Sequence, residues 1–308
     1  MPSKRSIQDK IRATGNIRQI TRAMELVAAT KMRKAEHVAL RARPFAKNAF
    51  RLLRNLLSYA HGEQAFQESS LFQKNEKGDT CLLLITSDRG LCGSYNTSVL
   101  RGAVKFIREE KNVRGVAVGK KAATFFRKAG IQMDAEFSQL SDIASLADGS
   151  PIAEFLLSQY EKGIYQRVFS CSTMFLSALS QKAELREILP LSVQSLQDMI
   201  QGILPQKGMY AKQEEKEEAV FYPYVMELPF NSLFDALLRQ LFYVEVLHLL
   251  FESNASEHAS RMVAMKNATE NATDILDTLT LSLNKARQAA ITQELAEVST
   301  AKEALTAE

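Results

Sequence analysis

Residues 262–290 read MVAMKNATENATDILDTLTLSLNKARQAA. Apolar and small residues recur in this segment at alternating spacings of three and four, which is the heptad pattern of a helix that packs along a second helix. No glycine or proline follows Pro229, so nothing from Phe230 to Glu308 breaks a helix. We therefore predict a C-terminal helix over residues 230–308, with a seam formed by Met262, Met265, Thr269, Ala272, Leu276, Leu279, Leu283, Ala286 and Ala290.

Residues 1–60 are predicted to form a second, basic helix. Residues 1–54 hold 14 Lys and Arg against 3 Asp and Glu, a net charge of +11, whereas residues 252–308 hold 5 against 9, a net charge of −4. These opposite charges favour two helices that lie side by side. We expect Pro44 to kink or divide the N-terminal helix. One apolar stripe on this helix is expected to be buried, and it consists of Ile7, Ile11, Ile17, Ile20, Met24 and Val27.

The middle of the chain alternates between short apolar runs and helical patterns. The apolar runs predict strands at Thr80–Thr86, Val113–Val118 and Arg167–Phe175. Helices are predicted between them, at Ser94–Lys111, Lys120–Ala129 and Pro151–Lys162. This alternation is typical of an α/β unit around a largely parallel sheet. A polar loop at 205–218 and an extended piece at 220–227 are predicted to lead to the C-terminal helix.

The predicted fold class is α/β, with a long antiparallel coiled coil of the N- and C-terminal helices and an inserted Rossmann-like α/β domain. The helices are expected to be antiparallel because the inserted domain returns the chain to the point where it left. We divide the chain into an N-terminal coiled-coil helix at 1–60, an α/β foot domain at 61–229 with its core at about 79–190, and a C-terminal coiled-coil helix at 230–308.

The segment Ser87–Gly93, SDRGLCG, is a glycine-containing turn between a predicted strand and a predicted helix. Such turns can bind phosphate, but this one has neither the Lys and Ser/Thr of a P-loop nor the spacing of a dinucleotide motif. The four histidines are scattered, and the three cysteines lack metal-finger spacing and fit a reducing compartment. No apolar run approaches the ~18 residues that a membrane span needs. We predict no catalytic, cofactor-binding or metal-binding residue in this chain.

Three classes of function remain open at this point: a partner-binding protein, a nucleic-acid-binding protein and a nucleotide-dependent enzyme. The basic N-terminal helix could be a solvated face, could bind nucleic acid as the basic region of a zipper protein does, or could contact an acidic protein surface. A nucleic-acid-binding coiled coil with an inserted α/β domain is therefore an alternative to a partner-binding protein, although the acidic C-terminal end argues against it. A nucleotide-dependent enzyme that uses the central domain is the third possibility.

Four segments resemble the γ subunit of F-type ATP synthases. They are ITRAMELVAATKMRK at 20–34, SDRGLCG at 87–93, ASRMVAMKNAT at 259–269 and NKARQAAITQEL at 284–295. They span the chain in the family's order. The resemblance implies a rotor whose paired terminal helices form a shaft inside a hexamer of three α and three β subunits. It implies that ion flow turns a ring of c subunits and that the turning shaft changes the conformation of the β-subunit catalytic sites.

The resemblance also implies the partners and the location. The foot would contact the ε subunit and the c ring, with δ elsewhere in the complex, and no nucleic acid would be bound. The chain would have no active site of its own, would need no cofactor, and would be one subunit of a rotary H⁺-transporting ATP synthase. The lack of a transit sequence before Ser3 favours a bacterial source, with the complex peripheral to the cytoplasmic face of the plasma (inner) membrane.

Ten residues match family positions that contact the α and β subunits. The resemblance implies that Met24 meets a β-subunit lever segment and that the basic residues Lys31, Arg33 and Lys34 face acidic lever segments. Residues of the glycine-containing turn are implied to lie near the lower β surface, and residues near the C-terminus to bond with a β-subunit loop. The two latter sets are Asp88, Arg89 and Cys92, and Arg287, Gln288 and Thr292.

Overall fold

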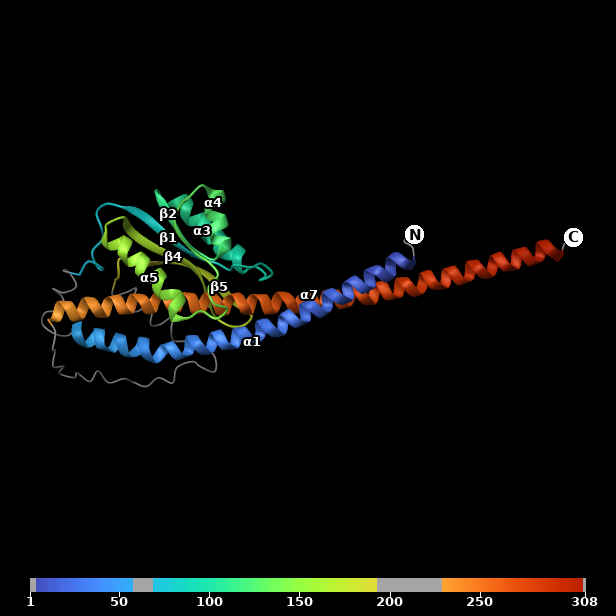
Figure 1. Cartoon of the computed structure of the whole chain (residues 1–308), viewed down its shortest axis with the longest axis horizontal. Helices are drawn as coiled ribbons and strands as arrows, with labels where there is room; N and C mark the ends of the chain where they lie inside the picture. The colour runs from blue at the N-terminus through green and yellow to red at the C-terminus, as the bar shows by residue number, and fades with distance from the viewer. Residues whose placement is uncertain (1–3, 58–68, 193–228, 307–308) are drawn as a thin grey trace. The chain divides into compact units, whose positions relative to one another are not determined.

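The computed structural model describes residues 4–57, 69–192 and 229–306 (Figure 1). The chain divides into two compact units, one made of Met1–Val27 and Met262–Glu308 and the other of Ala28–Arg261. Helices α1 (Lys4–Leu57) and α7 (Phe230–Thr306) contribute to both units. The larger unit also contains β1 (Asp79–Ile85), α3 (Tyr95–Glu109), β2 (Val113–Val118), α4 (Lys120–Ala129), β3 (Gln132–Phe137), α5 (Leu146–Glu161), β4 (Tyr165–Phe175) and β5 (Gln181–Leu189).

The larger unit is built on a mixed five-stranded sheet with the strand order β3-β2-β1-β4-β5. The strands β1 to β4 pair in parallel, whereas β5 runs antiparallel to β4. β1 is the central strand, and its Leu83 lies opposite Val116 on one side and Ser170 on the other. A strand in this position has helices over both faces, which is why Cys81–Ile85 is a continuous apolar run with every residue buried.

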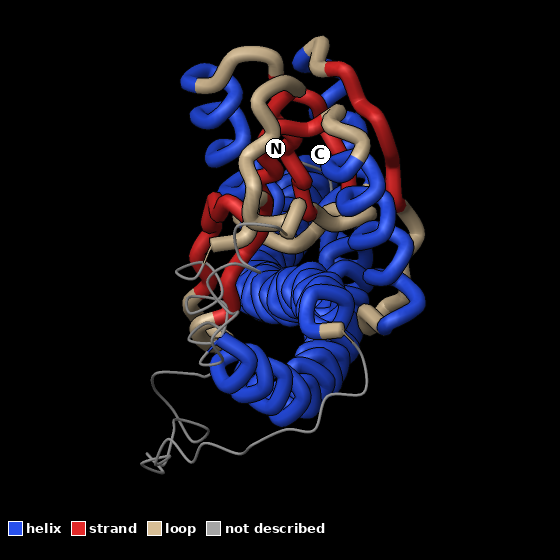
Figure 2. Tube along the Cα trace, turned by 90° about the vertical axis from the view of Figure 1, so that its left-hand side faces the viewer, coloured by secondary structure: helices blue, strands red, loops and turns tan. Residues whose placement is uncertain are grey.

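Helices cover both faces of this sheet (Figure 1, Figure 2). Alternate residues of β1 point to opposite faces, so Leu82 and Leu84 join one apolar core while Leu83 and Ile85 join the other. The first core is closed by α3 and α4. The second is closed by α5 and by the part of α7 before Met262. A side chain at Gly149 in α5 would collide with Leu247 of α7, so this glycine allows the two helices to approach closely.

Most of the predicted elements of the α/β region are confirmed. The predicted strands correspond to β1, β2 and β4, and the predicted helices to α3, α4 and α5. Helix α5 begins five residues before the predicted Pro151, because Ser145 and Asp148 form a capping box that starts the helix at Leu146. Strands β3 and β5 were not predicted. Both lie at the edges of the sheet, and their sequences QMDAEF and QKAELREIL lack a continuous apolar run.

Two further expectations concern the segments that flank the α/β region. Helix α1 continues through Pro44, so the helix is not divided at this residue, and the kink expected there stays a prediction. The predicted polar loop at 205–218 and the extended piece at 220–227 lie outside the described residues.

The smaller unit contains the first part of α1 and the last part of α7, which run antiparallel (Figure 1). The predicted seam of α7 is the face with reduced exposure. Met265 and Ala272 are buried, and Leu276, Leu279 and Leu283 are half-buried. The seam ends at Ala286, because Ala290 is exposed.

The predicted apolar stripe of α1 is wrong in part. Ile7 is buried, but Ile17, Ile20 and Val27 are 53%, 59% and 52% exposed. Ile11 and Met24 of the stripe also have reduced exposure. A row at heptad spacing with reduced exposure shares two residues with the stripe and comprises Ile7, Ile11, Thr14, Thr21 and Glu25. Beyond Ile11 this row consists of Thr14, Thr21 and Glu25 rather than Ile17 and Ile20, and the Thr21 hydroxyl contacts the Thr269 hydroxyl of the seam at 2.8 Å.

Candidate partner-contact site

The last turns of α7 present an exposed surface on the smaller unit. Arg287, Gln288 and Thr292 are all exposed. The Thr292 hydroxyl donates to the Gln288 carbonyl of its own helix at 2.9 Å. Among the described residues, the side chains of Arg287 and Gln288 have no hydrogen-bond or ion-pair partner, so their donors are available to another molecule. Large apolar side chains are exposed beyond them, namely Ile291 at 49%, Leu295 at 66% and Val298 at 68%.

The contact residues expected on α1 differ in their environments. Met24 is half-buried in the smaller unit. In the larger unit Arg33 and Lys34 are exposed, whereas the Lys31 ammonium lies 2.8 Å from an Asp142 carboxylate oxygen. This ammonium holds the pKa of Asp142 below its usual range. Lys31 therefore has a partner within the chain. Of these three basic residues, Arg33 and Lys34 are the two whose side chains are exposed.

The loop between β1 and α3 is held by its own side chains. The two carboxylate oxygens of Asp88 accept hydrogen bonds from the backbone N–H groups of Lys120 and Gln139, both at 2.9 Å. The Asn96 amide donates to the Ser87 hydroxyl at 2.7 Å and contacts the Cys92 sulfur at 3.1 Å. These contacts tie the turn to the start of α3, to α4 and to the loop after β3.

The outer part of this loop is exposed. Arg89 and Gly90 are exposed, and Leu91 is 65% exposed with a φ of 60°. A left-handed conformation is unfavourable for leucine, so the surrounding contacts must impose it. The three contact residues predicted in this loop therefore have different environments. Arg89 is at the surface, Cys92 is 3% exposed, and the Asp88 carboxylate accepts hydrogen bonds from two backbone N–H groups.

Residues of α7 that the sequence reasoning did not single out hold this loop. The Ser260 hydroxyl donates to the Cys92 carbonyl at 2.7 Å, and the Arg261 guanidinium donates to the Gly90 carbonyl at 3.4 Å. Deeper in the unit, the hydroxyls of Tyr95 and Ser253 are 2.6 Å apart. Ser260 and Arg261 lie within one of the family-like segments, and that was the available signal for them.

Helix α7 also carries a buried acid. Glu245 is 1% exposed, and among the described side-chain atoms its Oε1 has no hydrogen-bond partner. Burial raises the pKa of Glu245 to about 8, and the charge of Arg186 lowers it only in part. The described part of the chain provides no group of three His, Cys, Asp or Glu residues placed to hold a metal ion.

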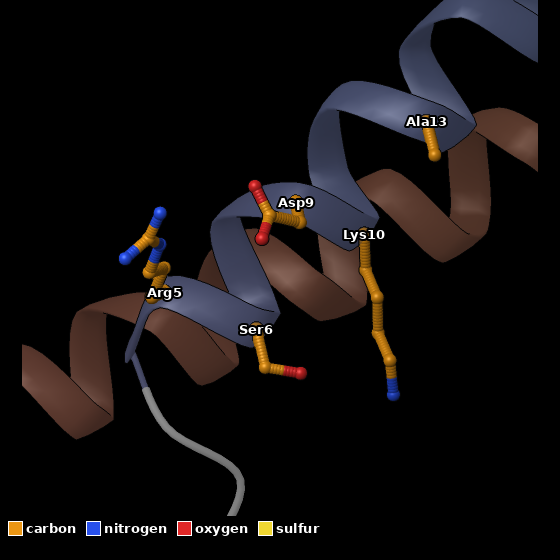
Figure 3. Close-up of a pocket in the computed structure, with 5 residues that line it drawn as sticks. All are labelled: Arg5, Ser6, Asp9, Lys10 and Ala13. Carbon is orange, nitrogen blue, oxygen red and sulfur yellow. The ribbon is translucent and has the colours of Figure 1, made fainter.

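An open pocket lies at the start of α1 in the smaller unit. It is lined by Arg5, Ser6, Asp9, Lys10 and Ala13, whose side chains project outward and do not converge on a common point (Figure 3). Such a surface lacks the enclosure that small-molecule sites have. Across residues 4–57, 69–192 and 229–306, no helix combines the length and hydropathy needed to cross a bilayer.

The fold is shared with chains in solved structures of mitochondrial ATP synthases. One chain of the Euglena gracilis OSCP/F1/c-ring structure aligns with a TM-score of 0.64 at 20% identity, over 99% of this chain and 95% of that chain. One chain of the Tetrahymena thermophila central stalk and c-ring structure aligns with a TM-score of 0.54 at 24% identity, over 81% of this chain and 99% of that one. At these identities the likeness concerns the fold alone.

Sequence comparison identifies the family. A family model described as ATP synthase matches residues 3–305. The ATP synthase gamma chain of Nostoc punctiforme is 38% identical over 317 residues, covering 99% of this chain and 100% of the relative. The ATP synthase gamma chain of a Synechocystis species is 38% identical over 312 residues, covering 97% and 98%. The chain belongs to the ATP synthase gamma chain family.

Proposed function

We propose that this chain is the rotor shaft in the F1 sector of an F-type ATP synthase. In this role it couples the ion-driven rotation of a c ring to conformational change at the β-subunit catalytic sites, and it performs no bond chemistry itself. The observation that carries the proposal is the 38% identity to an ATP synthase gamma chain over 99% of this chain. The nucleic-acid alternative receives no support from these relatives.

The smaller unit is proposed to act as an antiparallel coiled coil that enters a hexamer of α and β subunits. The half-buried seam of α7 between Met262 and Ala286 supports this proposal, as does the heptad-spaced row on α1. The exposed isoleucines Ile17 and Ile20 would then face the surrounding subunits rather than α7. Rotation of a shaft can shift the β subunits between conformations only if the shaft binds these conformations with different free energies. The two helices expose different side chains in different directions, so the contacts with a given β subunit would change as the shaft turns.

Ten residues are proposed as contacts with the α and β subunits. Arg287 and Gln288 would donate directional hydrogen bonds that form at one rotor angle and break at another. Arg33 and Lys34 would meet acidic segments through charge alone. Lys31 would contribute while paired with Asp142, and Cys92 would act by shaping the loop that presents Arg89. The remaining proposed contacts are Met24, Asp88 and Thr292.

The complex is proposed to supply the remaining partners and the location. The α/β foot would contact the ε subunit and the c ring, δ would belong to the same complex, and the whole would be peripheral to the cytoplasmic face of a bacterial plasma membrane. Residues 1–60 and 230–308 would form the shaft, and residues 61–229 the foot.

Reconstitution tests this function directly. The α and β chains of the Nostoc punctiforme ATP synthase would be mixed with this chain, and with buffer as the control. We expect a complex that contains one copy of this chain and hydrolyses ATP much faster than the α and β chains alone. A bead attached to Lys111, which is exposed, should rotate during hydrolysis. Unchanged assembly and activity without this chain would refute the proposal.

A further inference from the structure

The helical layer formed by α3 and α4 in the larger unit is strongly basic. Residues 97–128 hold 9 Lys and Arg against 2 Asp and Glu, a net charge of +7. Arg114 pairs with Asp134 within the sheet at 2.7 Å, and the other eight cations are exposed. We call these eight the basic face, which consists of Arg101, Lys105, Arg108, Lys111, Lys120, Lys121, Arg127 and Lys128.

Helix periodicity directs this charge away from the sheet. Helices α3 and α4 contact each other and bury their apolar sides in the same core, on one face of the sheet (Figure 1). In α3 the buried side includes Val99 and Ala103. Arg101 and Lys105 each follow one of these residues by two positions, which is about 200° around a helix. The cations of α3 therefore point to solvent, and the exposed cations of α4 likewise lie opposite its buried alanines.

The chain's own acids leave most of this charge unpaired. Glu109 lies 4.0 Å from the Lys105 ammonium in the same helix. Glu110 is directed to Arg167 of β4 instead, at 3.4 Å. The other seven cations of the basic face form no ion pair with any residue that the structure describes. A surface with such an excess of one sign attracts molecules of the opposite charge.

Helix stability explains only part of the basic face. Cations near a helix C-terminus are favourable, and this accounts for the basic residues in the last turns of α3 and α4. Lys120 and Lys121 lie in the first turn of α4, where the helix dipole makes a cation unfavourable. The Asp88 carboxylate accepts the Lys120 N–H, but within the described chain it pairs with neither ammonium. These two lysines add positive charge where the helix itself does not benefit from it.

The composition of the basic face indicates the class of anion that it fits. Neither α3 nor α4 exposes a large apolar or aromatic side chain. The face therefore has nothing to insert into a lipid bilayer and nothing on which nucleic-acid bases could stack. Arg101, Lys105 and Arg108 recur at spacings of four and three, so they form one row along α3. Carboxylates at the same spacings form a matching row on an acidic helix.

We propose that the basic face of α3 and α4 is a docking surface for an acidic helical segment of another protein. The face contains none of the ten residues proposed as contacts with the α and β subunits, so it is a separate surface. The inference does not depend on the rotor function, because it rests only on exposed charges of the larger unit. Salt screens attraction between exposed charges, so the binding should weaken as ionic strength rises.

A defined acidic peptide tests this surface on the full-length chain. The probe is a fluorescein-labelled helix of repeated Glu-Ala-Ala-Ala units, and the same peptide with Gln for Glu is its control. Fluorescence anisotropy at low salt should show binding of the acidic peptide alone. The triple variant Arg101→Gln, Lys105→Gln and Lys121→Gln should weaken this binding at least about tenfold, since each exposed ion pair can change an affinity by up to about fivefold.

A matched variant controls for net charge. Lys10→Gln, Arg12→Gln and Arg18→Gln remove the same charge from exposed positions of α1 and should weaken binding less than about threefold, because distant charges are screened. Circular dichroism should show the same helix content for both variants, since all six side chains are exposed. Equal losses of affinity in the two variants, or equal binding of the Gln peptide, would overturn the proposal.

Two further measurements do not rely on these variants. Carbodiimide coupling joins carboxylates to lysine amines in contact, and mass spectrometry should find the wild-type chain coupled to the acidic peptide at Lys105, Lys120, Lys121 and Lys128. Coupling mainly at α1 would overturn the proposal. Phosphatidylglycerol vesicles and duplex DNA serve as competing probes. If the α3 and α4 variant lost more affinity for either of these than for the peptide, the face would belong to another class of partner and the proposal would fail.

Discussion

The side-chain oxygens of Thr21 and Thr269 lie 2.8 Å apart and join α1 to α7 within the smaller unit. Each hydroxyl also contacts a carbonyl of its own helix, at Arg18 for Thr21 and at Met265 for Thr269. A hydroxyl carries a single proton, so the two threonines form a short chain of donors and acceptors that ends on a helix carbonyl. This polar contact marks the row of α1 that faces the seam of α7.

Thr269→Val should destabilise the smaller unit by about 1 kcal/mol, which is typical for the loss of one hydrogen bond between side chains. Thermal unfolding followed by helical circular dichroism would measure this change. Thr278→Val is the matched control, since Thr278 is exposed and bonds only to the Asp274 carbonyl of its own helix at 2.9 Å. Equal effects of the two substitutions would show that the interhelical bond contributes nothing.

Ile7 and Ile17 should respond differently to truncation. Ile7 is 5% exposed, and Ile7→Ala should cost about 2 kcal/mol through the lost apolar burial and the cavity. Ile17 is 53% exposed, and Ile17→Ala should change stability by less than about 0.5 kcal/mol. The same unfolding measurement checks both variants. A larger loss of stability for Ile17→Ala would mean that the face of α1 with Ile17 and Ile20, and not the face with Thr14 and Thr21, is buried.

Glu245→Gln should remove a pH dependence of stability. The folded-state pKa of Glu245 is raised to about 8 from 4.5, so the contribution of the protonated acid is complete below about pH 4.5 and is lost as the pH rises through 8. The variant should therefore be more stable than the parent at about pH 9, by a few kcal/mol at most, and similar to it at about pH 5. Urea unfolding at both pH values would measure the difference. An equal difference at the two pH values would exclude titration of Glu245 as the cause.

Gln288→Leu should slow ATP hydrolysis by the reconstituted complex roughly tenfold while assembly is retained, because a directional donor to a partner loop is lost. Turnover and gel filtration would be measured on the same preparation. Gln240→Leu is the matched control, since Gln240 is an exposed glutamine of α7 in the larger unit and outside the proposed contacts. Loss of assembly with Gln288→Leu would instead indicate that this residue is needed for the structure.

The sheet shows where sequence patterns are informative. The inner strands β1, β2 and β4 could be predicted because strands with neighbours on both sides and helices over both faces hold mostly apolar residues. The edge strands β3 and β5 could not, because solvent on one side permits polar residues such as those in QMDAEF. Position within the sheet, which depends on distant pairings, decided these two strands.

The candidate site shows the same division. The motif segments pointed to Arg287 and Gln288 and to Arg33 and Lys34, and all four are exposed. The motifs could not indicate that the Asp88 carboxylate is engaged by two backbone N–H groups. That partnership joins residues more than thirty positions apart, so only the folded chain could reveal it.

Residue order alone determined the long helices and the heptad seam of α7, because helix periodicity and the absence of glycine and proline are local properties. The family segments are likewise contained in the order of residues. The tertiary structure decided which row of α1 faces that seam, since hydrophobicity does not indicate the contact between the hydroxyls of Thr21 and Thr269. It also decided that Asp142, which no motif contains, contacts Lys31 of α1 through its carboxylate and His258 of α7 through its backbone carbonyl, because hydrogen bonds between distant residues form only when the fold brings them together.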